Sequence, residues 1–413
     1  MAGTTATQPR ALLALSLPAL LIGVGASLLL LGVSTVAEAL QKAVWERLPH
    51  ALGIGGEPAW WTVLILVLAG VAVGLVVWKV PGHAGPDPAT EGLVAPPMPA
   101  PVVPSLLLAT VLTLAGGVSL GPENPITAVN IALAFALGRR FLPKVPGEAW
   151  VGLAAAGTIG ALFGTPVAAA LILSETMTGE SGTPLWDRLF APLVAAGAGA
   201  LTTVVLAAPV LAVDVPGYPG FRLVDLVSGS VIALAACALG LVLVYAFPYV
   251  HAAFHRLPGP VAALVAGGAV LGVLGAIGGR ITLFKGLSEM KTLTEHVSSH
   301  STGGLLLIVV VKLAALLTAA SCGFRGGRIF PSVFTGVAIG LLANRLVDDV
   351  PVSLAISAGV LGLLVAVTRQ GWLSLFMAVT VVTDIKLLPL MCVVILPPWL
   401  LAVGRPPMLV KEG

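Results

Sequence analysis

The stretch Gly-Pro-Glu-Asn-Pro at residues 121–125 places a carboxylic acid among glycine and proline residues in a very apolar part of the chain. Residues 106–120 before it and 131–137 after it are almost wholly apolar, so Glu123 lies in a break between two membrane-embedded segments. Such a break is tolerated in a bilayer only where it is buried in protein or lines a wet cavity. Glu123 is therefore predicted to be a gate, a proton carrier or an ion ligand. The alternative is an acid in a short turn outside the membrane.

The composition fixes the class of protein. Of the 413 residues, 58% are hydrophobic and 9% are charged, and the mean hydropathy is +1.06. These values indicate an all-α polytopic membrane protein. Apolar runs of about 20 residues, or fewer where broken or tilted, give about ten to fourteen segments. They fall near residues 11–36, 60–79, 103–120, 125–142, 150–174, 189–212, 226–248, 258–278, 304–322, 331–347, 352–368, 371–383 and 386–403.

Several other classes of protein are disfavoured. The formal charge of +3 is diffuse, so nucleic acid is not an expected partner. Cys237, Cys322 and Cys392 lie far apart in apolar runs, which argues against a disulfide framework and a metal site. The six histidines show no metal-ligand spacing in this interpretation, and no metal or other cofactor is expected.

The second half of the chain repeats the layout of the first. Gly-Arg-Ile-Phe-Pro at 327–331 has the outline of Gly-Pro-Glu-Asn-Pro at 121–125, and each ends in a proline that opens an apolar helix. We expect a first transmembrane repeat over residues 1–205, a linker over 206–225 and a second repeat over 226–413. Broken helices at matching places are typical of a repeat transporter with its site near the midplane. The pattern leaves open whether the repeats are parallel or inverted.

Glycines support the same repeat. Gly157 and Gly160 in the first half correspond in position to Gly359 and Gly362 in the second. Their spacing suits close helix packing more than chemistry.

A third motif, Gly-His-Ala-Gly-Pro, lies at residues 82–86 and precedes a proline-rich passage. An exposed loop is one interpretation of it. Against this, the small residues Gly82, Ala84 and Gly85 would let an ion approach backbone N–H groups closely.

The three motifs together predict an anion site. Each broken helix supplies an N-terminus, whose free N–H groups and positive dipole end favour an anion. Arg325 and Arg328 either add positive potential or mark the membrane boundary. An ionised Glu123 would compete with the anion for the same N–H groups, and a protonated Glu123 would release them.

These residues resemble the signatures of the CLC family of chloride channels and proton-coupled anion exchangers, G-S-G-I-P, G-[K/R]-E-G-P and G-x-F-x-P, in order and spacing. The contexts at 115–120, 161–166 and 321–327 are also similar, so the resemblance covers nearly the whole chain, with most similarity to a divergent bacterial branch of ion-transport proteins. It implies an inverted-topology repeat with broken, tilted helices, and a homodimer with one pathway per subunit. It further implies the inner (plasma) membrane of a bacterium, with both termini in the cytoplasm. Because the chain ends at Gly413, no cytoplasmic regulatory domain is expected.

The resemblance also assigns roles residue by residue. Glu123 matches the family's gating glutamate, and Thr176 falls where proton-coupled exchangers carry an internal glutamate, with Glu175 matching its neighbour. His83 and Met408 replace the family's coordinating serine and tyrosine. The candidate anion-binding residues are Gly82, His83, Ala84, Gly85, Pro86, Gly121, Pro122, Asn124, Pro125, Gly327, Arg328, Ile329, Phe330, Pro331 and Met408, with backbone N–H groups at Arg328 and Ile329 matching the family's anion ligands.

The implied function is transport of a small inorganic anion across a lipid bilayer, not catalysis. Chloride is the default, and fluoride or another small anion stays open because both coordinating side chains differ. A channel and an antiporter that also moves protons are both open. The competing class is an intramembrane enzyme with Glu123 and His83 as an acid–base pair, but the sequence shows no nucleophile motif, second buried acid or metal cluster to support it. A cation-coupled transporter would need acids or carbonyl clusters at the midplane, and none is found.

Overall fold

The computed structural model describes residues 9–56, 58–176, 184–207 and 211–410. These residues form helices and connecting loops, and the described part contains no β-strand. The helices of the first half are α1 (Pro9–Lys42), α2 (Leu48–Ala51), α3 (Ala59–Lys79), α4 (Val103–Ala115), α5 (Glu123–Phe141), α6 (Gly147–Phe163), α7 (Pro166–Thr176) and α8 (Leu185–Leu206).

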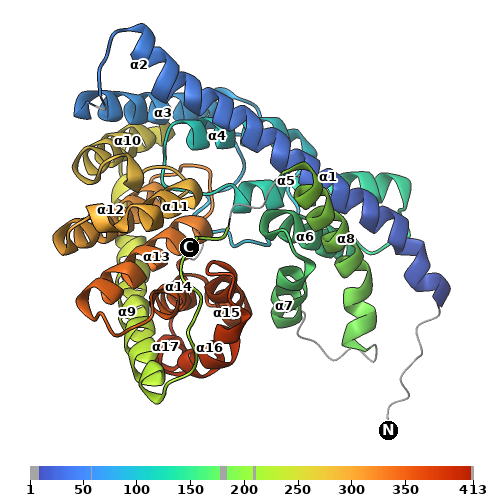
Figure 1. The fold of residues 1–413 in the computed structure, drawn as a ribbon. Helices are drawn as coiled ribbons and strands as arrows, with labels where there is room; N and C mark the ends of the chain where they lie inside the picture. Colours follow the sequence, from blue (N-terminus) through green and yellow to red (C-terminus); the bar gives the residue numbers. More distant parts are fainter. Residues whose placement is uncertain (1–8, 57, 177–183, 208–210, 411–413) are drawn as a thin grey trace.

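The helices of the second half follow the loop at residues 211–222. They are α9 (Leu223–Phe254), α10 (Gly259–Gly278), α11 (Leu287–Glu295), α12 (Thr302–Ser321), α13 (Ile329–Leu346), α14 (Val352–Thr368), α15 (Gly371–Thr380), α16 (Leu388–Val394) and α17 (Leu396–Ala402). Figure 1 shows α5 to α8 on one side and α9 to α17 on the other, with α1 running across and α3 lying beside α10.

The expectation of a polytopic membrane protein with broken helices is confirmed. In the described chain, seven helical segments are long and apolar enough to cross a membrane. Other apolar helices are shorter, including α4, α6, α7, α14 and α15, and the segments 385–394 and 396–402 meet at a bend of 46°. Short and bent segments leave backbone groups free within the protein, where an ion could use them.

Two expectations about segments need correction. Residues 150–174 were expected to form one span, but they belong to two helices, because Gly164 adopts a left-handed conformation (φ 66°) and Pro166 begins the next helix. Glycine reaches that conformation without strain and ends α6 there. The helix α11 was not expected at all, since its sequence is polar and lies outside the apolar runs.

The matching glycines bring helices into close contact in both halves of the chain. A Cβ atom on Gly160 of α6 would lie 2.2 Å from the carbonyl oxygen of Ala196 in α8. In the second half, a Cβ atom on Gly362 of α14 would lie 1.9 Å from the carbonyl oxygen of Ala233 in α9. Both distances are far below van der Waals contact, so the two halves use glycine in the same way to bring a pair of backbones together.

Two glycines of α8 provide a test of this packing. A Cβ atom on Gly199 would lie 2.3 Å from the carbonyl oxygen of Gly157, whereas a Cβ atom on Gly197 meets nothing within 4 Å. We expect Gly199→Ala to destabilise the protein by about 1–3 kcal/mol, since α6 and α8 must move apart. Gly197→Ala should be neutral or stabilising by up to about 1 kcal/mol, because alanine favours the helix. Thermal unfolding in detergent measures both, and equal unfolding temperatures for the two variants would contradict the packing.

Candidate anion site

The two broken helices meet through their backbones. The N–H of Gly121 donates to the carbonyl oxygen of Gly327 at 2.9 Å, and the N–H of Gly327 donates to the carbonyl oxygen of Gly121 at 2.7 Å. This antiparallel bridge joins residues 206 positions apart in the sequence. It holds the N-terminus of α5 against the N-terminus of α13.

Glu123 is the first residue of α5, and its side chain is fully buried. Its Oε1 accepts hydrogen bonds from the backbone N–H of Ile329 at 2.6 Å and of Phe330 at 3.2 Å. These are the free N–H groups of the first turn of α13, where the helix dipole favours negative charge. The other carboxylate oxygen, Oε2, is buried and has no hydrogen-bond partner. The carboxylate is thus held by one oxygen at a helix N-terminus that suits an anion.

The glycines of the bridge make room for this carboxylate. A Cβ atom on Gly121 would lie 2.0 Å from Oε2 of Glu123, and one on Gly327 would lie 2.2 Å from its Cδ. Neither glycine has a positive φ. Both positions therefore need glycine for space and not for backbone conformation.

The loop Gly82–Pro86 lies against the same region. Ala84, Pro86, Asn124 and Pro125 line one small cavity of about 40 Å³ together with Arg325. This volume holds about one water molecule. The structure therefore brings the motifs at 82–86 and 121–125 to one shared cavity.

Several backbone N–H and carbonyl groups of this loop form hydrogen bonds within the protein. The N–H of Ala84 donates to Oγ of Ser105 at 3.1 Å, and the N–H of Gly85 donates to the carbonyl oxygen of Gly82 at 2.9 Å. The guanidinium of Arg325 donates to the carbonyl oxygens of His83 and Gly85 at 3.3 and 3.1 Å. The loop is thus fastened by its neighbours at both its N–H and its carbonyl groups.

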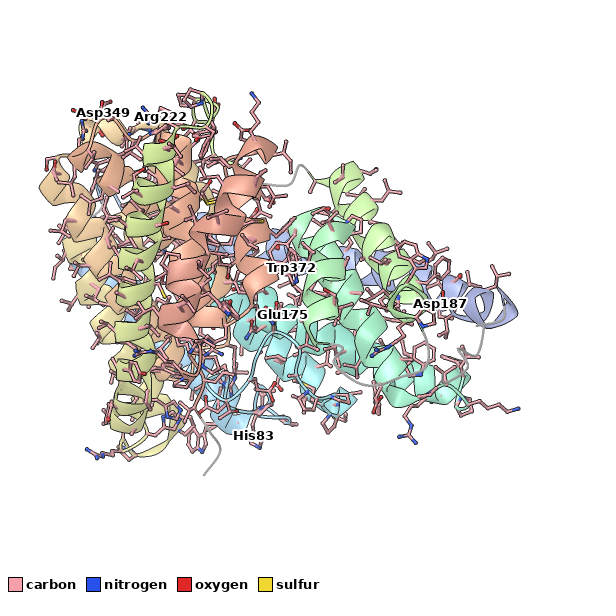
Figure 2. The ribbon with its side chains drawn as sticks, turned by 90° about the horizontal axis from the view of Figure 1, so that it is seen from below. His83, Glu175, Asp187, Arg222, Asp349 and Trp372 are labelled. Atoms are coloured by element: carbon pink, nitrogen blue, oxygen red, sulfur yellow. The ribbon has the colours of Figure 1, made fainter. Side chains whose placement is uncertain are left out.

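The His83 ring lies at the surface, whereas Glu123 is fully buried. The His83 side chain is exposed and its Nδ1 lies 2.9 Å from the carbonyl oxygen of Val77. Figure 2 shows His83 at one end of the molecule, with Arg222 and Asp349 at the opposite end and Glu175 and Trp372 between them. An acid–base pair of His83 with the buried Glu123 has no support in this arrangement.

Arg328 precedes α13 and sends its buried side chain to three backbone carbonyls. It donates to the carbonyl oxygens of Met408, Glu91 and Pro88, the last two at 2.7 and 3.3 Å. Met408 is itself buried. Met408, the candidate anion-binding residue near the C-terminus, therefore lies beside the N-terminus of α13, with its carbonyl group facing Arg328.

Glu175 makes a second contact of an acid with a helix N-terminus. Its Oε1 lies 3.1 Å from the N–H of Gly371 and its Oε2 lies 3.4 Å from the N–H of Trp372, at the start of α15, and the two labelled side chains lie together in Figure 2. Thr176 ends α7, and its side chain lies outside the described residues. The sequence placed Glu175 beside the internal-glutamate position of the family but did not predict this contact.

Aromatic residues near the gate candidate were also missed. The Phe163 ring contacts the Phe330 ring edge-on, with centroids 6.1 Å apart, and the Phe376 ring at 6.0 Å. Phe163 ends α6 directly before the Gly164 break, and a large apolar residue at such a break was the available signal.

The expectation that the histidines lack metal-ligand spacing is wrong. His251 and His255 are four residues apart on α9, and their rings meet Asp87, so that the three side chains form a group able to hold a metal ion. The spacing was visible in the sequence, but Asp87 is 164 residues away from His251.

Comparisons with known proteins identify the family. Residues 70–400 match the model of the family described as "Voltage gated chloride channel". The chain is 52% identical to "Putative ion-transport protein YfeO" of Escherichia coli O9:H4 (strain HS), over 98% of this chain and 97% of the relative. Identity to the protein of the same description from Escherichia fergusonii is also 52%, with the same coverage. The chain belongs to the voltage-gated chloride channel (CLC) family, whose members transport anions across membranes.

Solved structures agree with this fold. A CLC-type fluoride/proton antiporter superposes with a TM-score of 0.78 at 20% identity, covering 96% of this chain and 97% of that chain. A slow cyanobacterial Cl⁻/H⁺ antiporter superposes with a TM-score of 0.79 at 17% identity, covering 98% and 97%. These likenesses confirm the CLC-type fold, with its inverted repeat and broken helices.

A double-mutant cycle tests the position of the Glu123 side chain. The three atoms nearest to a Cβ atom on Gly327 all belong to Glu123. We expect Gly327→Ala to destabilise the protein by about 1–3 kcal/mol through this overlap. In a Glu123→Ala background the same change should be at least about 1 kcal/mol less destabilising, because the two sites are in contact. Chemical or thermal unfolding in detergent gives the coupling, and an equal effect in both backgrounds would place the carboxylate elsewhere.

Proposed function

We propose that this CLC-family protein exchanges chloride for protons, with Glu123 as the gate of an anion site at the N-termini of α5 and α13. The observation that carries the proposal is the contact of the buried Glu123 Oε1 with two N–H groups of α13. A carboxylate oxygen held in this way is chemically equivalent to a bound anion. An anion from solution can therefore take its place only when the carboxylate leaves.

Protonation supplies the step that releases the carboxylate. A neutral carboxylic acid is a weaker acceptor for N–H groups than a carboxylate, because the charge-assisted part of the hydrogen bond is lost. The freed N–H groups of Ile329 and Phe330 then suit the incoming anion. Oε2 has no partner in the described structure and is the oxygen open to a proton. One acid would in this way both vacate the site and carry a proton.

Two further observations support the coupling of anion and proton. Glu175 meets the N-terminus of α15 and gives the pathway a second acid. The two solved structures of similar fold are proton antiporters for fluoride and for chloride. Thr176, where exchangers of the family carry an acid, favours the alternative of an uncoupled channel.

The wider setting belongs to the same proposal. We infer a homodimer from the family resemblance, and a bacterial inner membrane from the Escherichia relatives. The candidate lining is the three motifs at 82–86, 121–125 and 327–331. The backbone N–H groups of Ile329 and Phe330, not the changed side chains at His83 and Met408, are the proposed source of selectivity.

Replacement of Glu123 by glutamine tests the gate. Glutamine has the shape of the protonated acid but cannot carry a proton, so Glu123→Gln should abolish proton movement while anion flux persists. Chloride release and external pH are recorded together from liposomes that contain the purified protein. Glu148→Gln is the matched control, because Glu148 lies in the first turn of α6 but is exposed, and it should keep both fluxes. Unchanged proton movement in Glu123→Gln with intact anion flux would overturn the gate.

Ion selectivity and voltage distinguish the remaining alternatives. Liposomes loaded with chloride or fluoride should release chloride faster, and faster fluoride release would reassign the substrate. Under a pH gradient, the reversal potential of an antiporter departs from the anion Nernst potential, whereas the potential of a channel follows it. We expect the departure, and its absence would establish a channel.

A further inference from the structure

A cluster of three metal-binding side chains lies outside the candidate anion site. His251 and His255 are one turn apart at the end of α9, so their side chains share a helix face. Asp87 follows the loop at 82–86 and places Oδ2 2.8 Å from Nε2 of His251 and 3.1 Å from Nε2 of His255. The two rings are stacked with centroids 3.8 Å apart. Two imidazoles and a carboxylate thus converge on one point.

The hydrogen bonding of His255 is compatible with a metal ion at this point. Its Nδ1 lies 2.9 Å from the backbone carbonyl oxygen of His251. A carbonyl oxygen only accepts, so Nδ1 carries the hydrogen, and in the neutral ring Nε2 presents a lone pair. That lone pair faces the Asp87 carboxylate, which is also an acceptor. Either a proton on Nε2 or a metal ion bound to both atoms satisfies these two acceptors at 3.1 Å. Donation of the other ring N–H to a backbone carbonyl is also the usual arrangement of a metal-bound histidine.

The distances suit a small divalent ion. The three ligand atoms all lie within 4.8 Å of one another. A tetrahedral ion with bonds of about 2.0–2.2 Å separates its ligand atoms by about 3.3–3.5 Å. The contacts of Asp87 with the two rings, at 2.8 and 3.1 Å, therefore need to open by about 0.2–0.7 Å. Two histidines and a carboxylate are a donor set typical of zinc, and three protein ligands leave a fourth position for water.

An ion can reach the cluster from solution. The side chains of His255 and Asp87 are 44% and 28% exposed, and both line a cavity of about 340 Å³. Arg325 lines the same cavity and opposes a cation there, but its guanidinium donates to the carbonyl oxygens of His83 and Gly85. The Asp87 carboxylate and the two imidazoles remain the groups that would face the ion.

We propose that Asp87, His251 and His255 form a zinc site that ties the end of α9 to the segment following the loop at 82–86. The ion replaces the contacts of Asp87 with the two rings by three metal bonds. The site is independent of the proposed anion exchange, because none of its three side chains belongs to the candidate anion site.

Zinc titration of the full chain tests the site. Untagged protein in detergent, stripped with a chelator, is titrated with zinc chloride by calorimetry. We expect one zinc ion per chain, and a loss of affinity of at least about tenfold in each of His251→Ala, His255→Ala and Asp87→Asn. His296→Ala is the matched control, because its Nδ1 also contacts a carbonyl one turn back, at 3.1 Å, while its ring lies outside the cluster. This variant should bind zinc like the unchanged protein.

The proposed site would be overturned if all variants bound zinc as tightly as the unchanged protein. It would also be overturned if His296→Ala lost as much zinc affinity as the three cluster variants. X-ray absorption of the zinc-loaded, unchanged protein gives a second measurement that does not depend on the folding of variants. A first shell of nitrogen and oxygen atoms at about 2.0–2.2 Å is expected. A sulfur atom in that shell would move the ion to Cys322, which lines the same cavity, and would equally overturn the assignment.

Discussion

A carboxylate buried in an apolar interior needs hydrogen-bond donors, and the donors of Glu123 come from the other half of the chain. The N–H groups of Ile329 and Phe330 are available only because α13 begins at that point. The bridge between Gly121 and Gly327 fixes the two helix ends, and the missing side chains at both glycines leave space for the carboxylate. The break in each helix, the glycine beside it and the acid are thus parts of one arrangement. Each part reduces a cost of the others, since a bare helix end or a bare acid at this depth is unfavourable.

Buried cations are also held by backbone groups, in their case by carbonyl oxygens. The ammonium of Lys312 donates to the carbonyl oxygens of Thr282, Leu283 and Phe284 at 3.1, 2.9 and 3.0 Å. Arg325 and Arg328 likewise donate to backbone carbonyls. In the described part of the chain, Glu123 makes no ion pair with any of these cations, so backbone holds the charges of both signs. An acid bound only by N–H groups can exchange with a free anion, whereas one bound in a buried ion pair would leave an uncompensated cation behind.

The sequence predicted the features that depend on local rules. Pro125 and Pro331 indicated the helix starts to within two residues, since α5 begins at Glu123 and α13 at Ile329. Glycines at matching positions indicated the close packing of α6 against α8 and of α14 against α9. Features that depend on distant contacts were not predictable in the same way. The His83 ring is exposed and contacts the carbonyl oxygen of Val77, while Ser105 and Arg325 hold the loop backbone. In the sequence, Lys312 is a charged residue in an apolar run. Its three carbonyl partners could not be predicted, because the fold brings them to it from residues 282–284. The His251 and His255 pair was overlooked because its third member, Asp87, is remote in sequence.

The two acids that meet helix N-termini differ in a way that bears on their roles. Glu123 is fully buried and uses one oxygen, whereas Glu175 is half-buried and has an N–H group near each oxygen. Water partly screens the interaction at Glu175, so an anion that replaced it would gain little from the α15 dipole. At Glu123 the same exchange takes place away from water, where each N–H contact has its full strength. In the proposed mechanism the competition between carboxylate and anion therefore belongs to Glu123, and Glu175 serves a passing proton and not the anion.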